Sequence, residues 1–542
     1  MTVDVANRFW GTLDLRARRV ALSATFLVGV LTLYAVLRAM LIATASRTPI
    51  GCLGLDIATF AAACAFVGIR YDELPSLLRP LLRGIAAVVL VQVAFDSAAL
   101  SYAPAYMKSG ETGAFFIGGS VIGMAAGLLA VWRPSFALPL FFHYVAFRHQ
   151  LNRVSGVPVS ETDYLSMLDI GGFVVLGSLA TVFATRPRNA ARLLPAWADA
   201  AALRDSACAL IWAWAVGAHL GNYFISGWTK VQAGGGDPLF WLLHNPTQTS
   251  ILIGLERGDN PLAAWPWLVQ LSWDAIVKGG VALNLFVLGL QLASPLAILR
   301  RRLLMTFTML FDLFHIAVYM TLGAMFTFWI AVNVLIYLSA KRINDKALTP
   351  AMQAVTLLSI LTAHVFFFYT NHLGWLDGAK LSSPSVVAET RDGRHVPVPS
   401  VFFGILSYSI AQTAMYVPND NFPMRLGGNT YNPTDWKDAQ SCGPQMVHHQ
   451  STGVTLDTVK TMVQQTDAAM RRLPSIKDVN LYYVYPHHMV ANPLMFEPFN
   501  ALTMNDIVRY HYIVDSVCLS LRNGHLVRDV RKTTDIPIDV GP

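Results

Sequence analysis

Long apolar runs recur through the first two thirds of this sequence, and they constrain its fold more than any other feature. A helix needs about 20 mostly apolar residues to cross the hydrocarbon core of a bilayer. Such runs predict about eleven membrane-spanning helices, at residues 21–44, 52–69, 84–104, 114–132, 135–149, 167–185, 207–228, 280–298, 303–321, 323–340 and 351–370. The fifth run is short, so a half-helix or an interfacial segment is the alternative there.

The composition favours a membrane protein. Hydrophobic residues make up 54% of the chain and charged residues 13%, whereas soluble domains are about 25% charged. The net charge of +7 comes from basic residues grouped in alternate loops, such as the three arginines at 300–302. This pattern argues against nucleic acid as a partner and makes the basic loops cytoplasmic. The N-terminus is then cytoplasmic and the C-terminal domain periplasmic or extracellular, and Arg- and Ala-rich loops favour a bacterial inner membrane.

Three parts follow from the composition. Residues 1–20 predict an amphipathic segment on the cytoplasmic surface, residues 21–370 a transmembrane domain, and residues 371–542 a soluble extracytoplasmic domain. In the last part, Asp392-Gly393 and Asn523-Gly524 predict β-hairpins. Two helices and a strand are also expected there, at 401–416, 455–472 and 479–485. The expected fold is an all-α polytopic membrane bundle followed by a small α+β extracytoplasmic domain.

Residues 229–279 interrupt the succession of clean spans. They contain a glycine-rich stretch, several prolines and four tryptophans, Trp241, Trp265, Trp267 and Trp273. Proline breaks helices, and tryptophan concentrates where the membrane meets water. We therefore expect interfacial or re-entrant structure on the outer side, which could form the wall or mouth of a lipid-accessible site.

Five polar residues lie on one face of the seventh apolar run: His219, Asn222, Tyr223, Ser226 and Lys230. At about 100° per residue they form one stripe. A lysine at the end of a span can be an interfacial anchor whose amino group extends to the membrane surface. It can also be a desolvated general base. The polar stripe favours the second interpretation, with Lys230 as a catalytic residue and the other four as candidates for binding the substrate.

A second polar face lies in the ninth run. Asp312, His315 and Tyr319 fall at offsets of 0, 3 and 7 residues, so they share a helical face. A carboxylate one turn before a histidine can orient the imidazole and increase its basicity. We predict catalytic roles for Asp312 and His315 and a binding role for Tyr319. The alternative is a hydrogen-bond network that holds the helices together.

A third polar group lies at the outer end of the fifth run. His143, Arg148 and Arg153 could bind a carboxylate or a phosphate headgroup of a substrate. They could equally be interfacial anchors, because arginines are common at the ends of membrane helices.

Of the five cysteines, Cys442 and Cys518 lie in the soluble part and could pair as a disulfide if that part is outside. Neither of the histidine pairs, at 448–449 and 487–488, has a third ligand at a recognisable spacing, so no metal site is predicted. The sequence also has no GxSxG, HExxH or phosphate-binding glycine motif. Hydrolase, zinc-protease and nucleotide-driven activities are therefore not indicated.

Two stretches resemble a known family. Residues 223–230, YFISGWTK, are similar to a motif of the vitamin K-dependent gamma-glutamyl carboxylase and of its bacterial relatives, the horizontally transferred transmembrane (HTTM) proteins. Phe314-His315 and the residues 322–331 resemble a second span of that family, and 291–295 lie where relatives carry a short polar-x-x-small-Pro motif. The resemblance covers about residues 205–340.

The resemblance implies a membrane enzyme with a carboxylase- or lyase-type activity. Lys230 occupies the place of the lysine that deprotonates reduced vitamin K, and His315 would belong to the same cavity. The implied cofactor is a reduced, vitamin K-like quinone, and the substrate is a quinol or another lipid-borne molecule that enters from the bilayer. This sequence departs from the carboxylase at Thr229, where the carboxylase has a second lysine, and in its shorter C-terminal part.

A non-enzymatic function is the main alternative. The chain would then be an accessory or assembly subunit of a membrane complex, with an outer domain that binds a partner protein and polar stripes that hold helices together. A transporter is less favoured, because the sequence has no paired broken helices in two matching halves.

Overall fold

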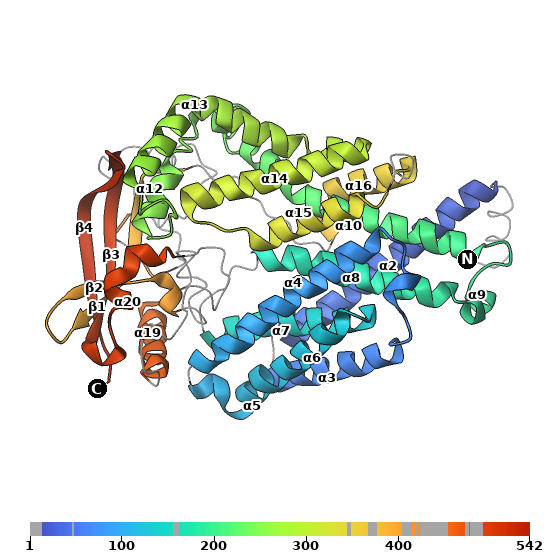
Figure 1. Cartoon of the computed structure of the whole chain (residues 1–542), viewed down its shortest axis with the longest axis horizontal. Helices are drawn as coiled ribbons and strands as arrows, with labels where there is room; N and C mark the ends of the chain where they lie inside the picture. Colours follow the sequence, from blue (N-terminus) through green and yellow to red (C-terminus); the bar gives the residue numbers. More distant parts are fainter. Residues whose placement is uncertain are drawn as a thin grey trace.

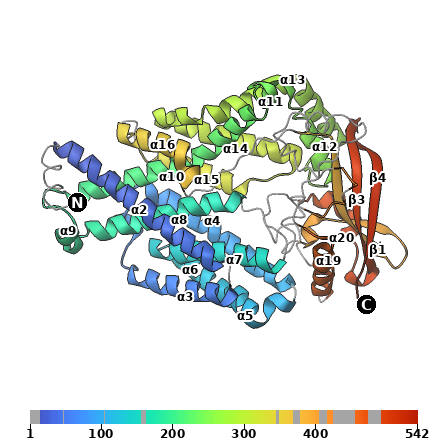
Figure 2. The same ribbon diagram turned by 180° about the vertical axis from the view of Figure 1, so that it is seen from behind.

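The computed structural model describes residues 14–45, 48–103, 105–155, 162–343, 348–366, 377–403, 415–418, 420–422, 454–471, 476 and 491–541. Helices form an elongated bundle, and an antiparallel sheet lies against one end of it (Figure 1). The view from behind shows the same arrangement, with the N-terminal helix at the opposite end of the molecule from the sheet (Figure 2).

The bundle is built from helices of very different lengths. They are α2 (Leu15–Ala45), α3 (Pro49–Ala65), α4 (Leu78–Ala99), α5 (Gly110–Gly113), α6 (Ser120–Ala130), α7 (Ala137–Ser155), α8 (Thr162–Thr185), α9 (Pro187–Leu193), α10 (Ala200–Gln232), α11 (Phe240–His244), α12 (Thr249–Glu256), α13 (Pro266–Leu292), α14 (Arg301–Leu322), α15 (Thr327–Ala340) and α16 (Pro350–Phe366). A π-helical stretch, Ala114–Gly119, joins α5 to α6.

Among the described residues, seven helices are long and apolar enough to cross a membrane: Ala17–Thr44, Leu78–Ala99, Gly110–Ala130, Met167–Thr185, Ala200–Gln232, Pro266–Leu292 and Arg301–Leu322. Three further apolar helices are shorter: Pro49–Ala65, Thr327–Ala340 and Pro350–Val365. The structure therefore fits a multi-pass membrane protein with a small sheet near its C-terminus. The number of eleven spans stays a prediction.

Helix α10 lies in the centre of the bundle and carries the predicted polar stripe. Its start is fixed by Asp199, whose side chain accepts hydrogen bonds from the N–H groups of Ala201 and Ala202 at 3.0 and 3.2 Å. Two glycines allow α16 to approach closely. A Cβ at Gly217 would lie 2.5 Å from the carbonyl oxygen of Thr356, and one at Gly221 would lie 3.0 Å from that of Ile360. Small residues at such a crossing let two helix backbones meet in a membrane.

The segment 229–279 is more helical than expected. Helix α10 continues to Gln232, the short helices α11 and α12 follow, and α13 begins at Pro266. The Trp-rich piece from Pro266 to residue 276 is therefore the beginning of a long helix. The physical reason is that a proline in the first turn of a helix loses no hydrogen bond and starts the helix instead of breaking it. Between Gln232 and Pro266 the chain forms only the short helices α11 and α12, and an interfacial or re-entrant position for this stretch stays a prediction.

The C-terminal part contains a four-stranded antiparallel sheet in the order β2-β1-β3-β4. Its strands are β1 (Lys380–Thr390), β2 (His395–Val398), β3 (Ile507–Arg522) and β4 (His525–Asp539). Both predicted hairpins are confirmed. The β3–β4 turn has positive φ at Asn523 (50°) and Gly524 (76°), as a two-residue hairpin turn requires.

Helices α19 (Leu456–Met470) and α20 (Glu497–Asn500) accompany the sheet. The helix predicted at 455–472 is α19, and the Thr455 side chain caps it by accepting a hydrogen bond from the N–H of Thr458 at 3.2 Å. The strand predicted at 479–485 and most of the helix predicted at 401–416 lie outside the described residues.

The sheet is fixed to the segment that follows α10. Leu252 of α12 packs with Leu381, Val517 and Leu519 of the sheet. Arg528 of β4 pairs with the buried Glu256 at 2.8 Å. These contacts attach the C-terminal domain directly to α12.

Candidate functional site

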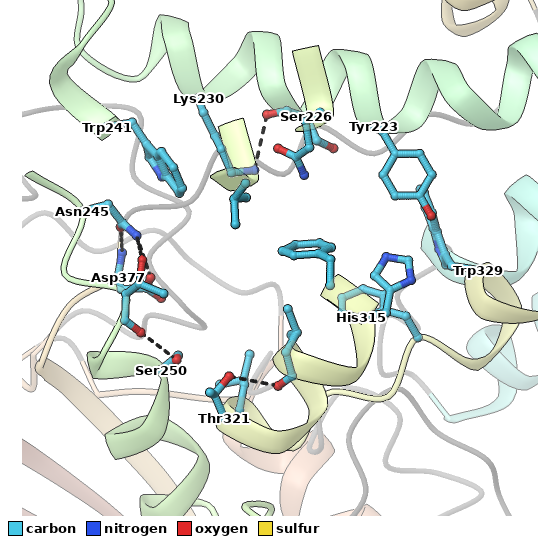
Figure 3. Close-up of a pocket in the computed structure, with 17 residues that line it drawn as sticks. Tyr223, Ser226, Lys230, Trp241, Asn245, Ser250, His315, Thr321, Trp329 and Asp377 are labelled. Atoms are coloured by element: carbon cyan, nitrogen blue, oxygen red, sulfur yellow. Dashed lines mark hydrogen bonds between the residues drawn. The ribbon is translucent and has the colours of Figure 1, made fainter. Parts of the chain in front are cut away.

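A cavity of about 800 Å³, including its open mouth, lies where α10, α13, α14 and α15 meet the segment after α10. Figure 3 shows Trp241, Asn245 and Asp377 together on one side of it, and His315, Tyr223 and Trp329 on the other. Apolar side chains, among them Val287, Phe314 and Leu322, complete the walls. A pocket that is mostly apolar with a few convergent polar groups is the usual form of a small-molecule site.

The amino group of Lys230 faces into this cavity. The residue is only 4% exposed, and its Nζ donates a hydrogen bond to the carbonyl oxygen of Ser226 at 3.4 Å. The same atom lies 5.4 Å from the centre of the Trp241 ring, within the range of a cation–π contact. Lys230 is therefore enclosed by the protein at the cavity wall.

A carboxylate from the C-terminal part completes the polar side of the cavity. Asn245 holds Asp377 by two hydrogen bonds. Its Nδ2 donates to Oδ2 of Asp377 at 3.0 Å, and its Oδ1 accepts from the backbone N–H of Asp377 at 2.8 Å. Asn284 of α13 donates to the carbonyl oxygen of Asn245 at 2.9 Å. Asp377 is thus held rigidly at the wall that also carries Lys230.

The protonation of Asp377 is set by its burial. Burial raises the pKa of this carboxyl from 3.8 to about 7, while the hydrogen bond from Asn245 and the charge of Lys230 lower it to a smaller extent. A carboxyl with such a pKa can take up or release a proton near neutral pH.

The opposite side of the cavity is aromatic. The ring of His315 stacks with Phe326 at a centroid distance of 4.9 Å and with Tyr223 at 5.8 Å. Tyr223 in turn stacks on Phe311 at 3.5 Å, and Trp329 presents its edge to His315 at 5.9 Å. Such a wall suits a flat, apolar ligand.

Asn333 of α15 joins the two predicted polar stripes. Its Oδ1 lies 2.8 Å from Nε2 of His219, and its Nδ2 donates to the Tyr223 hydroxyl at 2.9 Å and to Oδ1 of Asp312 at 2.8 Å. His219 and Asp312 are thus brought together behind the cavity wall and do not line it. The Asp312 carboxylate therefore accepts a hydrogen bond from Asn333. It does not form the pair with His315 that the sequence predicted.

Removing the Asn333 amide is expected to destabilise the bundle. Asn333→Leu leaves three polar side chains without their shared partner, and interhelical hydrogen bonds in membrane proteins contribute about 0.6 kcal/mol each on average. We expect a melting temperature several degrees lower in differential scanning fluorimetry of the detergent-solubilised protein. Asn189→Leu, at a position where the amide makes an exposed hydrogen bond to the Phe183 carbonyl, is the matched control. Equal shifts in the two variants would contradict the role of Asn333.

The other predicted site residues lie away from this cavity. Asn222 donates to the carbonyl oxygen of Ala218 in its own helix at 3.2 Å, and Tyr319 is half-buried on α14 without lining the cavity. His143 contacts Asp56 at 2.9 Å and Arg148 contacts Asp96 at 3.4 Å, all of them buried between helices. Arg153 is exposed at the end of α7.

The cysteines separate into two groups. Cys52, Cys64 and Cys208 form no disulfide bond, whereas Cys518 is disulfide-bonded. Cys442, the partner predicted for it, lies outside the described residues. Among the described residues, no group of three or more His, Cys, Asp or Glu side chains is placed to hold a metal ion.

Comparisons of the chain with protein-family models, with curated proteins and with solved structures return no match.

Proposed function

We propose that this protein is a membrane enzyme in which Lys230 acts as a base on a quinol or another lipid-borne substrate. The observation that carries the proposal is a buried lysine amino group at the wall of a largely apolar, aromatic cavity. An amino group kept from water is costly to hold in its charged form, and the neutral amine is a proton acceptor.

Three polar residues of the cavity then have a part in the reaction. Lys230 accepts the proton of a quinol hydroxyl, and His315, on the aromatic wall, donates a hydrogen bond to the substrate or relays the proton. Asp377 faces Lys230 across the polar side and balances its charge after proton transfer. The resemblance to the vitamin K-dependent carboxylase extends the proposal to oxygen-driven carboxylation, and that extension rests on the motifs alone.

The direct test is product formation by the full chain in proteoliposomes. The protein would receive a reduced naphthoquinone, oxygen, radiolabelled carbon dioxide and a glutamate-containing peptide as the carboxyl acceptor, and the quinol, its epoxide and label fixed on the peptide would be followed. Protein-dependent consumption of the quinol supports acid–base chemistry at the cavity, and fixed label in addition supports carboxylation. Quinol consumption no faster than in empty liposomes would refute the proposal.

The raised pKa of Asp377 predicts how the stability of the protein depends on pH. A carboxyl whose pKa rises from 3.8 to about 7 on folding binds its proton more tightly in the folded state. Its contribution to stability is therefore greatest below pH ~4 and is lost as the pH rises towards ~7. Asp377→Asn cannot ionise, so its melting temperature is expected to fall less than that of the wild type between pH 5 and 8. Asp205→Asn, at a carboxyl that is 69% exposed, is the control and should keep the wild-type slope.

The alternative, an accessory subunit, has one structural observation in its favour. Strand β4 lies at the edge of the sheet, and most of its residues are exposed. An edge strand can pair with a strand of another protein. This function predicts a stoichiometric partner that co-purifies with the wild type and is lost on substitution in β4, while Lys230→Ala retains it.

We also propose that the protein resides in a bacterial inner membrane with its N-terminus in the cytoplasm and its C-terminal domain in the periplasm. The disulfide at Cys518 supports an oxidising compartment for that domain. Protease added to intact spheroplasts should then cleave the sheet domain and leave the cytoplasmic loops intact.

A further inference from the structure

The C-terminal sheet carries a titratable cluster on the face opposite its core. Tyr510 and Tyr512 of β3 are buried in the core, so His511 between them points to the other face, because side chains alternate along a strand. There Nε2 of His511 lies 3.1 Å from Oε2 of Glu389 on β1, and Nδ1 lies 2.9 Å from Oδ1 of Asp535 on β4. One imidazole ring thus contacts carboxylates of both neighbouring strands.

This geometry determines the protonation state of the ring. An ionised carboxylate only accepts hydrogen bonds, and a neutral imidazole has a single N–H to donate. Both nitrogens of His511 can donate only when the ring is a positively charged imidazolium. The observed contacts with Glu389 and Asp535 are therefore those of the protonated cluster.

Other charged groups of the sheet surround the ring. Arg509 of β3 lies 3.8 Å from Glu389, and the ring of His395 on β2 lies 4.8 Å from that of His511. These two groups oppose a positive charge on His511, but they are not in contact with a carboxylate-free ring edge. Burial lowers the pKa of His511, and the hydrogen bonds and charges of Asp535 and Glu389 raise it by more. The pKa of His511 is therefore above its ordinary value of 6.5.

The two carboxylates differ in how easily they can leave the ring. A neutral His511 has one N–H for both of them. Glu389 also has Arg509 beside it, and it is 27% exposed, whereas the Asp535 side chain is 46% exposed. Asp535 is already half hydrated, so it loses less when the contact is broken. We therefore expect the neutral ring to keep Glu389 and to release Asp535, which is four residues before the end of β4.

We infer that His511 is a proton-operated switch, which fixes the C-terminal end of β4 to the sheet when it is protonated and releases that end when it is neutral. Because the folded protein binds this proton more tightly than the unfolded chain, the stabilisation is complete below pH ~6.5 and is lost as the pH rises through the pKa of the folded state. The edge that β4 offers to another strand is then fully ordered only at acidic pH.

The test is hydrogen exchange of the full chain in nanodiscs, measured by mass spectrometry between pH 5.5 and 8.5. Protection of residues 535–539, corrected for the intrinsic effect of pH on exchange, should fall about threefold in the wild type, the value of one partly exposed ion pair. His511→Gln cannot take up a proton, so its protection should not change with pH. Asp535→Asn should also remove the pH dependence, whereas Glu389→Gln should retain part of it.

A matched control is His525→Gln, which makes the same change at an exposed position in the same strand. It should keep the wild-type pH dependence. Carbon-13 NMR of labelled histidines gives a second measurement, in which the signal missing from His511→Gln should titrate above pH 6.5 in the wild type and at lower pH in Asp535→Asn. Wild-type protection that does not change with pH, or an equal change in His511→Gln, would overturn the inference.

Discussion

Replacing Lys230 by alanine is expected to abolish quinol turnover while the protein still folds and inserts. A positioned general base contributes about 10²–10⁴-fold to a rate, and the loss should appear in kcat. Lys230→Arg should be equally inactive, because a guanidinium stays protonated at all accessible pH values. Turnover would be measured as quinol consumption in proteoliposomes at matched protein content.

The control for this experiment is Lys278→Ala, which removes an exposed lysine of α13. It should retain wild-type turnover. Activity of Lys230→Arg close to the wild-type value would mean that the cavity needs a positive charge and not a proton acceptor. Unchanged activity of Lys230→Ala would exclude the proposed role and favour the accessory-subunit function.

Introducing a large side chain at Gly217 is expected to disrupt the bundle at its centre. A Cβ there would already lie 2.5 Å from the carbonyl oxygen of Thr356 and 2.6 Å from the Cβ of Ser359. Overpacking of a filled interior costs about 1–3 kcal/mol, and more where the neighbouring atoms are backbone. Gly217→Leu should therefore lower the yield of monodisperse protein severalfold and lower its melting temperature.

Gly289→Leu provides the comparison. Gly289 is also within a long apolar helix, α13, but a Cβ there meets nothing within 4 Å. The same substitution should be neutral or slightly stabilising, because leucine is a better helix former than glycine. Size-exclusion profiles and melting curves of the two variants would show whether Gly217→Leu destabilises the protein more than Gly289→Leu. Equal loss in both would show that the α10–α16 crossing is not the cause.

The features that local sequence determines were predictable. The apolar runs predict the positions of most long helices, because their length and composition decide whether a helix is stable in lipid. The eighth run, predicted at 280–298, was misplaced, because α13 spans Pro266–Leu292. The Asn523-Gly524 turn was equally clear, since few residue pairs adopt positive φ at both positions. Tyr223, Ser226, Lys230 and His315 also meet at one cavity, as the stripes and the resemblance implied.

What the sequence could not provide were contacts between distant segments. Asp377 follows the last apolar run by several residues, and nothing in its neighbourhood predicts that Asn245, 132 residues earlier, would hold it. Asn333 could have been singled out from the sequence, because it is a single amide in an otherwise apolar stretch. Its three partners, however, come from α10 and α14, and only the packing of these helices with α15 reveals them.

Because Asp377 belongs to the cavity wall, the helical bundle and the sheet cannot be separated without changing the site. Only two residues separate this carboxylate from the first residue of β1, and the sheet is anchored in turn to α12 through Arg528 and Glu256. A truncation after residue 370, at the compositional boundary, would remove Asp377 from the cavity wall together with the sheet. The smallest fragment that keeps the complete cavity must therefore include both the helical bundle and the sheet. A bundle transferred alone into another protein would have an incomplete cavity.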